Sequence, residues 1–392
     1  MTTPERPYQP SLAWRVGSTL NIGIVGSGWR AFLYALNRTE TKGLDGFLEL
    51  LNTRKDETKR TTGLITDRLD DPMIWGVLPY KYLWNPNNMR WSLGSYDICF
   101  KNKALELFFS TGNTLPTHRK AHSQYGGLFQ PTMTQVIRLL SDPHASTDPT
   151  HPTTQLSDHP SHPFPSSDPF TASLLTYSTT GLDSFPAPSA YPSRRHSWIH
   201  IFPEGMTHQH PEKVMRYFKW GVARLILEAE PCPDVVPMWI DGPQEVMSGE
   251  RGWPRPVPRC GKEIVVSFGE RVDTEKVFGP YRDRWERLKE KTRREKGVTR
   301  DLSQSDVGDG VREQRIGELA DEELMYGQEA EQLRIDVTMA VRNEVLKVRR
   351  QAGVPDEDPK RGLAETYRAE GGKEASKVEG EMADGSLVQP GV

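Results

Sequence analysis

The chain contains little cysteine and no long apolar run. Its 392 residues include three cysteines, Cys99, Cys232 and Cys260, which have no Cys-x-x-Cys spacing and leave an odd one unpaired. This pattern predicts neither a disulfide framework nor a zinc site. No stretch of about 18 uncharged apolar residues occurs, so no membrane-spanning helix is predicted. Glu5 and several prolines precede the first apolar stretch, which argues against a secretory signal.

The chain also has no large excess of charge of one sign. It carries 50 Lys and Arg against 53 Asp and Glu, a formal net charge of −3. This balance argues against a nucleic-acid binder that relies on a basic surface. Hydrophobic residues make up 35% of the chain, and the mean hydropathy is −0.63. We therefore expect part of the chain to lie outside any packed core.

The N-terminal region has an apolar stretch at residues 20–36 that Arg30 and several small residues interrupt. Trp14 and Tyr34 lie near arginines in the same region. Such a segment suits a membrane interface, although an ordinary amphipathic helix explains it equally well. We assign residues 1–55 as an N-terminal membrane-interface segment.

Residues 22–31 superficially fit a dinucleotide fingerprint, Gly26-x-Gly28-x-x-Ala31 after an apolar run. The fingerprint requires a strand before it and a complete βαβ unit around it. Residues 36–51 instead indicate a helix and a loop, with no good second strand. We therefore do not predict nucleotide binding.

Residues 142–195 differ from the rest of the chain in composition. They are rich in Ser, Pro, Thr, His and Asp and contain no Lys, Glu, Val, Ile or Met. Such a segment buries too little apolar surface to offset its ordering entropy, so we predict a disordered insertion. Its four histidines are the residue type of metal sites, but a solvated low-complexity loop is the favoured interpretation, and no metal site is predicted.

On both sides of this insertion, strand patterns alternate with helix patterns, which indicates an α/β domain over residues 56–275. Strands are expected at 63–66, 198–202, 235–240 and 263–268, helices from Pro72 and at 131–140 and 211–227, and an apolar run spans 96–100. From about residue 274 the chain is dense in charge. We predict that residues 276–392 form a solvated, charged helical extension with a disordered tail.

Two motifs follow predicted strands. Asp70 and Asp71 come after the first strand, where a carboxylate commonly orients and charges a catalytic histidine. Phe202-Pro203-Glu204-Gly205 ends a later strand. Ligands of α/β sheets gather at the carboxyl ends of strands, so Glu204 is a candidate ligand or orienting group.

Arg119 is a third candidate, because it follows a β-type run and precedes the flexible pair Gly126-Gly127. Its guanidinium can hold an anionic phosphate through two parallel hydrogen bonds. A plain surface arginine is the alternative interpretation.

Taken in order, these blocks resemble the glycerolipid acyltransferases, and most closely the tafazzin family of mitochondrial phospholipid–lysophospholipid transacylases in its fungal form. The resemblance spans roughly residues 10–275 apart from the insertion. The matching blocks are residues 70–79, 90–91, 97–100, 119, 127–130, 199–205, 218–221 and 224–226. After Gly205 the chain continues with Met206 and Thr207, whereas related glycerol-phosphate acyltransferases typically continue with Thr-Arg, whose arginine holds a phosphate.

The resemblance implies a glycerolipid-acyltransferase-like α/β fold with Asp70 as a catalytic residue. It implies substrate binding by the set Arg119, Phe202, Pro203, Glu204 and Gly205. It further implies CoA-independent acyl transfer that remodels cardiolipin, with monolysocardiolipin as acceptor, phosphatidylcholine as donor, and neither a metal nor another cofactor. The expected location is the mitochondrion, on membranes facing the intermembrane space.

The first block of the family motif is incomplete in this chain, and its histidine is missing. The first block of the family is Asn-His-x-Ser-x-x-Asp-Asp-Pro, in which the histidine is the general base and precedes the first aspartate by five positions. Here that position holds Ile65, with Leu64 and Asp67 at the asparagine and serine positions. A short deletion, a pseudoenzyme that binds lipid without chemistry, and recruitment of another histidine such as His200 or His122 all remain open.

Overall fold

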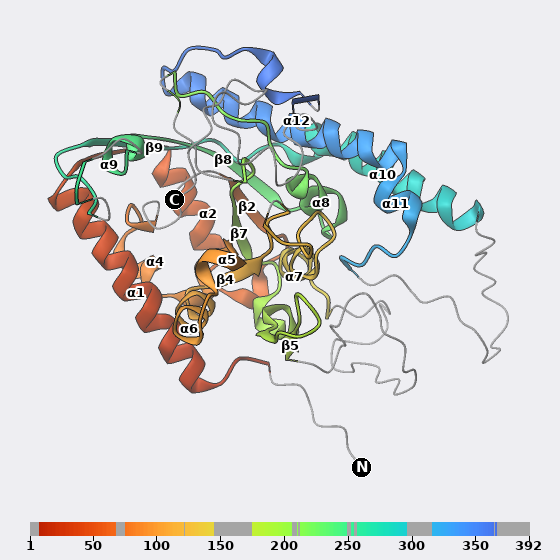
Figure 1. Cartoon of the computed structure of the whole chain (residues 1–392), viewed down its shortest axis with the longest axis horizontal. Coiled ribbons are helices and arrows are strands. Elements are labelled where there is room, and N and C mark those ends of the chain that lie inside the picture. The colour runs from red at the N-terminus through yellow and green to blue at the C-terminus, as the bar shows by residue number, and fades with distance from the viewer. Residues whose placement is uncertain are drawn as a thin grey trace.

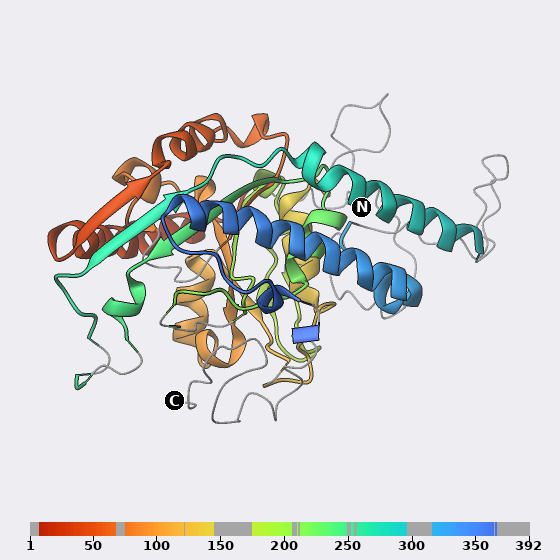
Figure 2. The same cartoon turned by 90° about the horizontal axis from the view of Figure 1, so that it is seen from above.

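The computed structural model describes residues 8–67, 75–120, 122–144, 175–205, 210, 212–248, 252–254, 257–295, 316–363 and 365–366. These residues form a seven-stranded sheet flanked by helices, in the order β1-β9-β8-β2-β7-β3-β4 (Figures 1 and 2). The strands are β1 Arg38–Lys42, β2 Leu64–Asp67, β3 Trp91–Ser95, β4 Thr114–Thr117, β7 Trp198–Ile201, β8 Asp234–Asp241 and β9 Glu263–Phe268.

Five of these strands, β8, β2, β7, β3 and β4, run parallel to one another. β9 pairs antiparallel with β8 and carries β1 parallel to itself at the edge of the sheet. The predicted α/β class is confirmed. The parallel part has a single carboxyl-terminal edge, at which the ends of β2, β7, β3 and β4 all lie.

The larger helices divide between the two faces of the sheet. α1 and α2, with α4, contribute to one apolar cluster, and α7, α8, α10 and α12 to the other. Figure 1 shows α1 along one margin of the molecule and α10 with α12 along the opposite one. The helices are α1 Leu12–Ala35, α2 Leu44–Thr53, α4 Tyr80–Leu83, α5 Tyr96–Cys99, α6 Lys103–Thr111, α7 Pro131–Leu140, α8 Gly221–Glu228, α9 Pro243–Val246, α10 Thr274–Glu295, α11 Glu322–Tyr326 and α12 Gln328–Gln351.

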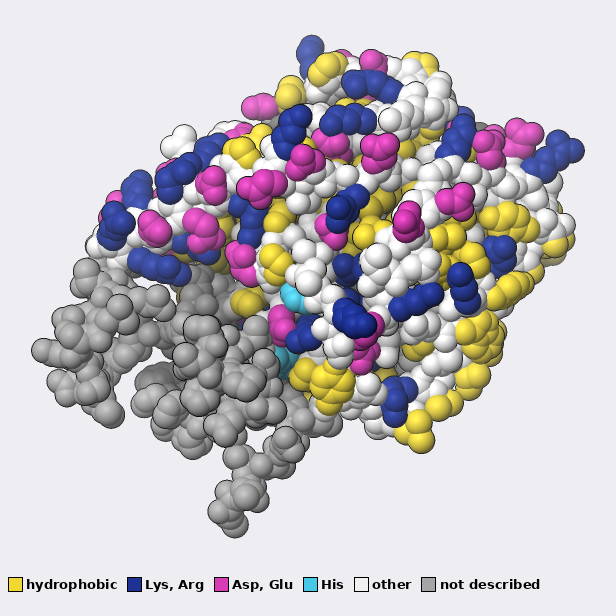
Figure 3. Space-filling view, turned by 180° about the vertical axis from the view of Figure 1, so that it is seen from behind, with side chains coloured by type: hydrophobic (Ala, Val, Ile, Leu, Met, Phe, Trp, Pro, Cys, Tyr) yellow, Lys and Arg dark blue, Asp and Glu magenta, His cyan; other side chains and the backbone are white. Residues whose placement is uncertain are grey.

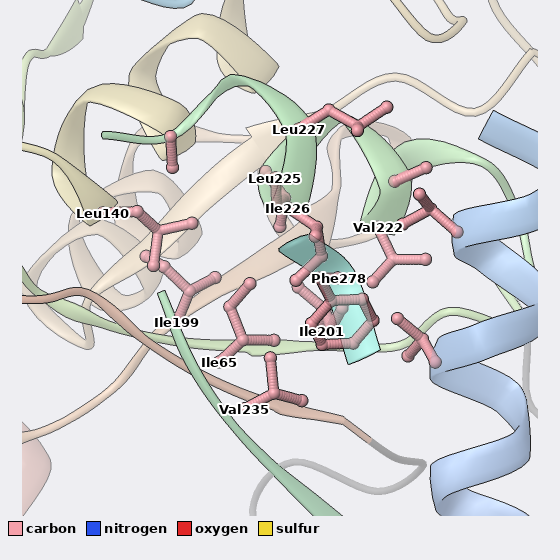
Figure 4. Packing of buried hydrophobic residues seen from close by; sticks show 14 of the residues in the cluster. Ile65, Leu140, Ile199, Ile201, Val222, Leu225, Ile226, Leu227, Val235 and Phe278 are labelled. Carbon is pink, nitrogen blue, oxygen red and sulfur yellow. The ribbon is translucent and has the colours of Figure 1, made fainter. Parts of the chain in front are cut away.

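The central strands are buried on both faces. All four residues of β2 are buried, with Leu64 in the cluster of α1 and α2 and Ile65 in the cluster of α7 and α8. Figure 4 shows Ile65 packed among Ile199, Ile201 and Val235 of the neighbouring strands. Because successive side chains of a strand point to opposite faces, this arrangement also determines which face each site residue occupies.

The segment with the apparent dinucleotide fingerprint lies inside α1 and does not follow a strand. Gly23 and Gly26 allow close helix packing, because a Cβ atom would lie 2.5 Å from the Trp84 ring and 2.9 Å from the Leu83 side chain. The expectation of no strand in residues 36–51 is wrong, since β1 lies there. β1 is a polar edge strand with alternating exposure, so it lacks the apolar pattern from which strands are predicted.

The predicted disordered insertion is too wide at both ends. Residues 142–144 and 175–195 are ordered and contain β5 (Thr176–Tyr177), β6 (Phe185–Pro186), η3 (Pro188–Ala190) and η4 (Pro192–Arg194). Tyr177 and Phe185 pack with Phe100 in a small apolar cluster. Residues 145–174 of the insertion lie outside the described residues. The aromatic residues near its end supply the apolar surface that its composition as a whole lacks.

Three predicted elements differ from the structure or lie outside it. The helix expected at 211–227 begins only at Gly221. Residues 212–219 before it form neither helix nor strand, with Val214, Met215 and Phe218 buried. The apolar run at 96–100 forms the short helix α5. Residues 72–74, where a helix was expected to begin, are not described.

The prediction of a solvated C-terminal extension is wrong for the described helices. α12 buries Leu333, Val337, Val341 and Val345 in the core cluster that it shares with α8, α10 and β8. These apolar residues recur every four positions, so one stripe of an otherwise charged helix faces the core. Figure 2 shows α12 and α10 running side by side along the main body. Residues 367–392, the predicted tail, lie outside the described residues.

Within the described residues, no helix is both long and apolar enough to cross a membrane.

Candidate active site

A small hollow lies where β2 and β7 end. The two strands pair in parallel, with Asp67 opposite Ile201, so their carboxyl ends meet at one edge of the sheet. Asp67, Phe202, Pro203 and Glu204 line the hollow, which has a free volume of about 220 Å³ including the part open to solvent. Its remaining walls come from the 212–219 segment and from α12. The structure thus brings three of the predicted substrate-binding residues together.

The turn after β7 depends on its glycine. The Gly205 N–H donates a hydrogen bond to the Phe202 carbonyl at 2.9 Å, and the Lys219 N–H donates to the Pro203 carbonyl at 2.6 Å. Gly205 has φ +73°, and a Cβ atom there would lie 3.1 Å from the Lys219 side chain. Glycine adopts this left-handed conformation without the steric cost that other residues incur. The turn therefore holds Phe202, Pro203 and Glu204 in a defined arrangement at the strand end.

Glu204 faces into the protein. Its side chain is 4% exposed, and one carboxylate oxygen accepts a hydrogen bond from the Arg216 N–H at 3.2 Å. Of the two roles predicted for Glu204, ligand or orienting group, this placement fits the orienting role, because the carboxylate ties the 212–219 segment to the turn after β7.

Asp67 is a buried carboxylate and was not among the site residues predicted from the sequence. It is 1% exposed and lies at the last position of β2, on the wall of the hollow. The predicted catalytic residue Asp70 follows three positions later and lies outside the described residues. The signal that could have identified Asp67 is its position as the one charged residue of β2, at the carboxyl end of that buried strand.

The position that corresponds to the missing histidine lies in the core. Ile65 is 0% exposed and is surrounded by strands β7 and β8 and by α7 and α8 (Figure 4). A general base must come within hydrogen-bond reach of the proton that it removes. Ile65 lies two residues before the end of β2, among core side chains, and is not one of the residues that line the hollow.

His200, named as a possible replacement base, is enclosed in the protein. It is 0% exposed, and its Nδ1 atom lies 2.8 Å from the Thr66 hydroxyl. Its ring packs edge-on against Trp75 at 5.1 Å between centroids. Because His200 alternates with Ile201, it points to the face of the sheet opposite the hollow. His122, the other candidate, is exposed near the end of β4, two strands beyond β7.

Arg119 follows β4, at the same edge of the sheet but two strands from β7. Its guanidinium forms a two-point ion pair with Asp97, with one contact of 3.2 Å from Nε to Oδ1. Burial would raise the pKa of Asp97, but the hydrogen bonds and charge of Arg119 outweigh this effect and lower that pKa. Arg119 therefore does not line the hollow, and the fork expected to hold a phosphate holds a carboxylate.

The described ranges contain no group of three or more His, Cys, Asp or Glu side chains that could hold a metal ion.

The chain is similar to three curated proteins over most of its length. It is 34% identical to the tafazzin of Saccharomyces cerevisiae over 81% of this chain and 74% of that protein. It is 26% identical to the tafazzin of Drosophila melanogaster over 68% of this chain and 54% of that protein. It is 25% identical to the N-acylphosphatidylethanolamine synthase of Arabidopsis thaliana over 60% of this chain and 64% of that protein. No family model matches the chain.

The sheet is mostly parallel, and Asp67 and the turn after β7 lie together at its carboxyl edge. Together with these relatives, this arrangement places the protein among the phospholipid acyltransferases. The identity to the yeast protein is distributed over four-fifths of the sequence. The chain belongs to the tafazzin family.

Proposed function

We propose that the protein acts in CoA-independent acyl transfer between a phospholipid and a lysophospholipid, remodelling cardiolipin with monolysocardiolipin as acceptor and phosphatidylcholine as donor. The similarity to the yeast tafazzin over 81% of the chain carries this proposal. The hollow at the ends of β2 and β7 supports it, because it lies where ligands of parallel sheets bind. No metal and no CoA is required by this reaction.

In the proposed reaction, a histidine five residues before Asp70 would take the proton of the lysophospholipid hydroxyl. Asp70 would orient the imidazole and stabilise its charged form. The alkoxide would attack an acyl ester of the donor, whose own alkoxide leaves and recovers the proton. Phe202, Pro203, Glu204 and Gly205 would bind the substrate at the hollow. Arg119 would bind a more distant part of the substrate, and only by exchanging its ion pair with Asp97 for a phosphate.

This chain lacks that histidine, and the burial of Ile65 helps to explain how the histidine was lost. Three substitutions in place would put the base position of the family inside the core, where it could do no chemistry. A loss of a few residues after β2 removes the asparagine, histidine and serine together and leaves the strand intact. We therefore favour a deletion or a faulty splice junction between β2 and Asp70, and a chain that is strongly impaired as written.

The protein is further proposed to work at a mitochondrial membrane facing the intermembrane space. Leu12, Val16, Leu20 and Ile24 recur every four residues on α1 and are 48–68% exposed. We call these four residues the outer stripe of α1. Figure 3 shows hydrophobic side chains gathered along the margin at which α1 lies. An apolar stripe on a helix suits burial in the interfacial region of a bilayer.

Two other functions fit a family member without its base. A pseudoenzyme would bind anionic vesicles and transfer no acyl group. A CoA-dependent lysophospholipid acyltransferase would need acyl-CoA. The absence of the histidine favours the first over the second, since both acyl-transfer reactions need a base.

The test measures transfer of a labelled acyl chain from phosphatidylcholine to monolysocardiolipin without CoA. A variant in which Asn-His-Ala-Ser replaces Asp67 places a histidine five residues before Asp70. General-base catalysis contributes about 10²–10⁴-fold, so we expect the variant to exceed the present chain by that factor. Equal rates for the two proteins would contradict the proposal. Acceleration by acyl-CoA would favour the CoA-dependent function.

Ile65→His tests whether a histidine at position 65 can reach the substrate. We expect no gain in transfer and a loss of roughly 2 kcal/mol or more in the free energy of unfolding, because an imidazole would be buried among apolar side chains. Ile65→Val is the matched control and should cost about 0.5–1.5 kcal/mol. Urea unfolding measures both. Restored activity in Ile65→His would show that position 65 reaches the substrate.

A further inference from the structure

A second hollow lies at the opposite edge of the sheet from the candidate active site. It is formed between the start of α1, η2 (Pro86–Asn88) and η4, and its free volume is about 320 Å³ including the part open to solvent. Trp91 begins β3, and Asn113 and Ser197 immediately precede β4 and β7. Since these strands are parallel to β2, the hollow lies at their amino ends, away from Asp67 and Glu204.

Trp14 places an unsatisfied donor at this hollow. Its indole Nε1 atom is buried and has no hydrogen-bond acceptor within the described part of the chain. Buried indole N–H groups are ordinarily paired, because leaving the donor without an acceptor costs its desolvation free energy. An acceptor bound in the hollow would remove that cost.

Arg194 also lines the hollow and contributes a positive charge to it. Its guanidinium lies over the Trp91 ring at 4.8 Å from the centroid and over the Tyr191 ring at 5.4 Å. Apart from these ring contacts, it has no hydrogen bond or ion pair among the described residues. Burial lowers the pKa of Arg194 to about 10, so the group remains charged at neutral pH. The two rings hold the guanidinium in place and leave its N–H groups for an anion.

Arg15 adds a second cation, and no carboxylate balances the pair within the hollow. One Arg15 nitrogen donates to the Gln9 side-chain oxygen at 2.9 Å, and none of the nine lining residues is acidic. Glu57 is not among the lining residues but lies next to them. Its carboxylate accepts hydrogen bonds from the side chains of Gln9 at 3.2 Å and Asn87 at 3.3 Å. The hollow therefore combines two guanidinium groups and a free N–H donor without a negative charge on its wall.

We propose that this hollow binds a phosphate group, held by Arg194 and Arg15 and by the indole N–H of Trp14. A guanidinium fork matches two oxygens of a phosphate, and the Trp14 N–H suits a further oxygen. The phosphate belongs either to a lipid headgroup at the membrane surface or to a soluble phosphate. The site is separate from the acyl-transfer edge and does not depend on the reaction proposed above.

The test follows the Trp14 indole signal in ¹H–¹⁵N spectra of the full-length chain, identified by its loss in Trp14→Phe. One arm titrates inorganic phosphate at constant ionic strength. The other arm measures sedimentation with phosphatidylcholine vesicles, with and without phosphatidic acid. Arg194→Met keeps an apolar stem on the two rings and removes the charge. Arg38→Met is the control, because Arg38 is exposed on the edge strand β1.

We expect Arg194→Met to weaken binding at least tenfold and Arg38→Met to leave it unchanged. A saturable shift of the Trp14 signal with inorganic phosphate supports a soluble ligand. A response only to vesicles with phosphatidic acid supports a lipid headgroup. If Arg194→Met fails to fold, Arg194→Lys keeps the charge without the fork and should still weaken binding several-fold. Binding that is absent in both arms, or equal in wild type and the folded Arg194 variant, overturns the proposal.

Discussion

Among single residues, Gly205 favours glycine, because its backbone is left-handed and the Lys219 side chain lies close to where a Cβ atom would be. Gly205→Ala should lower the free energy of unfolding by about 1–2 kcal/mol, since a left-handed backbone places Cβ against a carbonyl oxygen. Gly17→Ala is the control. Gly17 lies in α1 with no atom near its added Cβ, so alanine there should be neutral or stabilising. Urea unfolding compares the two, and equal effects would contradict the assigned turn.

His118 makes stability depend on pH. Its ring lies between the Thr179 hydroxyl at 2.8 Å and the Ser123 hydroxyl at 3.1 Å. Burial lowers the pKa of His118, although the charges of Asp183 and Asp97 act in the opposite direction. The folded state therefore binds this proton less readily than the unfolded state. The stabilisation is present above the unfolded pKa of about 6.5 and is lost as pH falls through the lower folded value.

Urea unfolding at pH 7.5 and 5.5 measures this loss. His118→Gln should reduce the difference in unfolding free energy between the two pH values, and His122→Gln, at an exposed position, should not. If the unfolding free energy changed equally between the two pH values in wild type and in His118→Gln, groups other than His118 would cause the pH dependence.

At the scale of elements, α1 has two faces with different partners. Its inner face packs through Gly23 and Gly26 on the α4 region, and the side chains of its outer stripe are 48–68% exposed. The double variant Leu20→Glu and Ile24→Glu should reduce sedimentation with anionic vesicles at least tenfold. Each apolar side chain that leaves the bilayer costs about 1.5–3 kcal/mol.

Leu182→Glu is the matched control for that double variant. Leu182 is 93% exposed and lies in the loop between β5 and β6, not on α1. It should not change sedimentation. Unchanged binding of the double variant would place the membrane contact elsewhere on the protein.

The elements that the sequence predicts correctly share one property, which is a local pattern that tertiary packing leaves intact. β2, β8, β9 and α7 lie where their apolar residues indicate, because both sides of a central strand or one stripe of a helix are apolar. β1 and β3 were not predicted from the sequence. β1 is polar, and β3 contains Gly94, so neither has the density of apolar residues that marks a buried strand.

For the whole molecule, α12 decides whether the charged C-terminal region belongs to the domain. Leu333 is 0% exposed and joins the same cluster as β2 and α8. Leu333→Ala should lower the free energy of unfolding by about 2–5 kcal/mol, as expected for a deeply buried leucine. Lys347→Ala, on the exposed side of α12, should change it by no more than about 0.5 kcal/mol. If both variants changed the free energy of unfolding by the same small amount, the C-terminal region would be a solvated extension and not part of the core.

The sequence by itself determined the α/β class, the central strands and the family to which the chain belongs, because these depend on local pattern and on the order of motifs. Only the tertiary structure decided that α12 completes the core, that Arg119 pairs with Asp97 and that position 65 is inaccessible. Each of these facts depends on which residues distant in sequence become neighbours. Parallel strand pairing and helix packing determine those neighbours, and no local pattern encodes them.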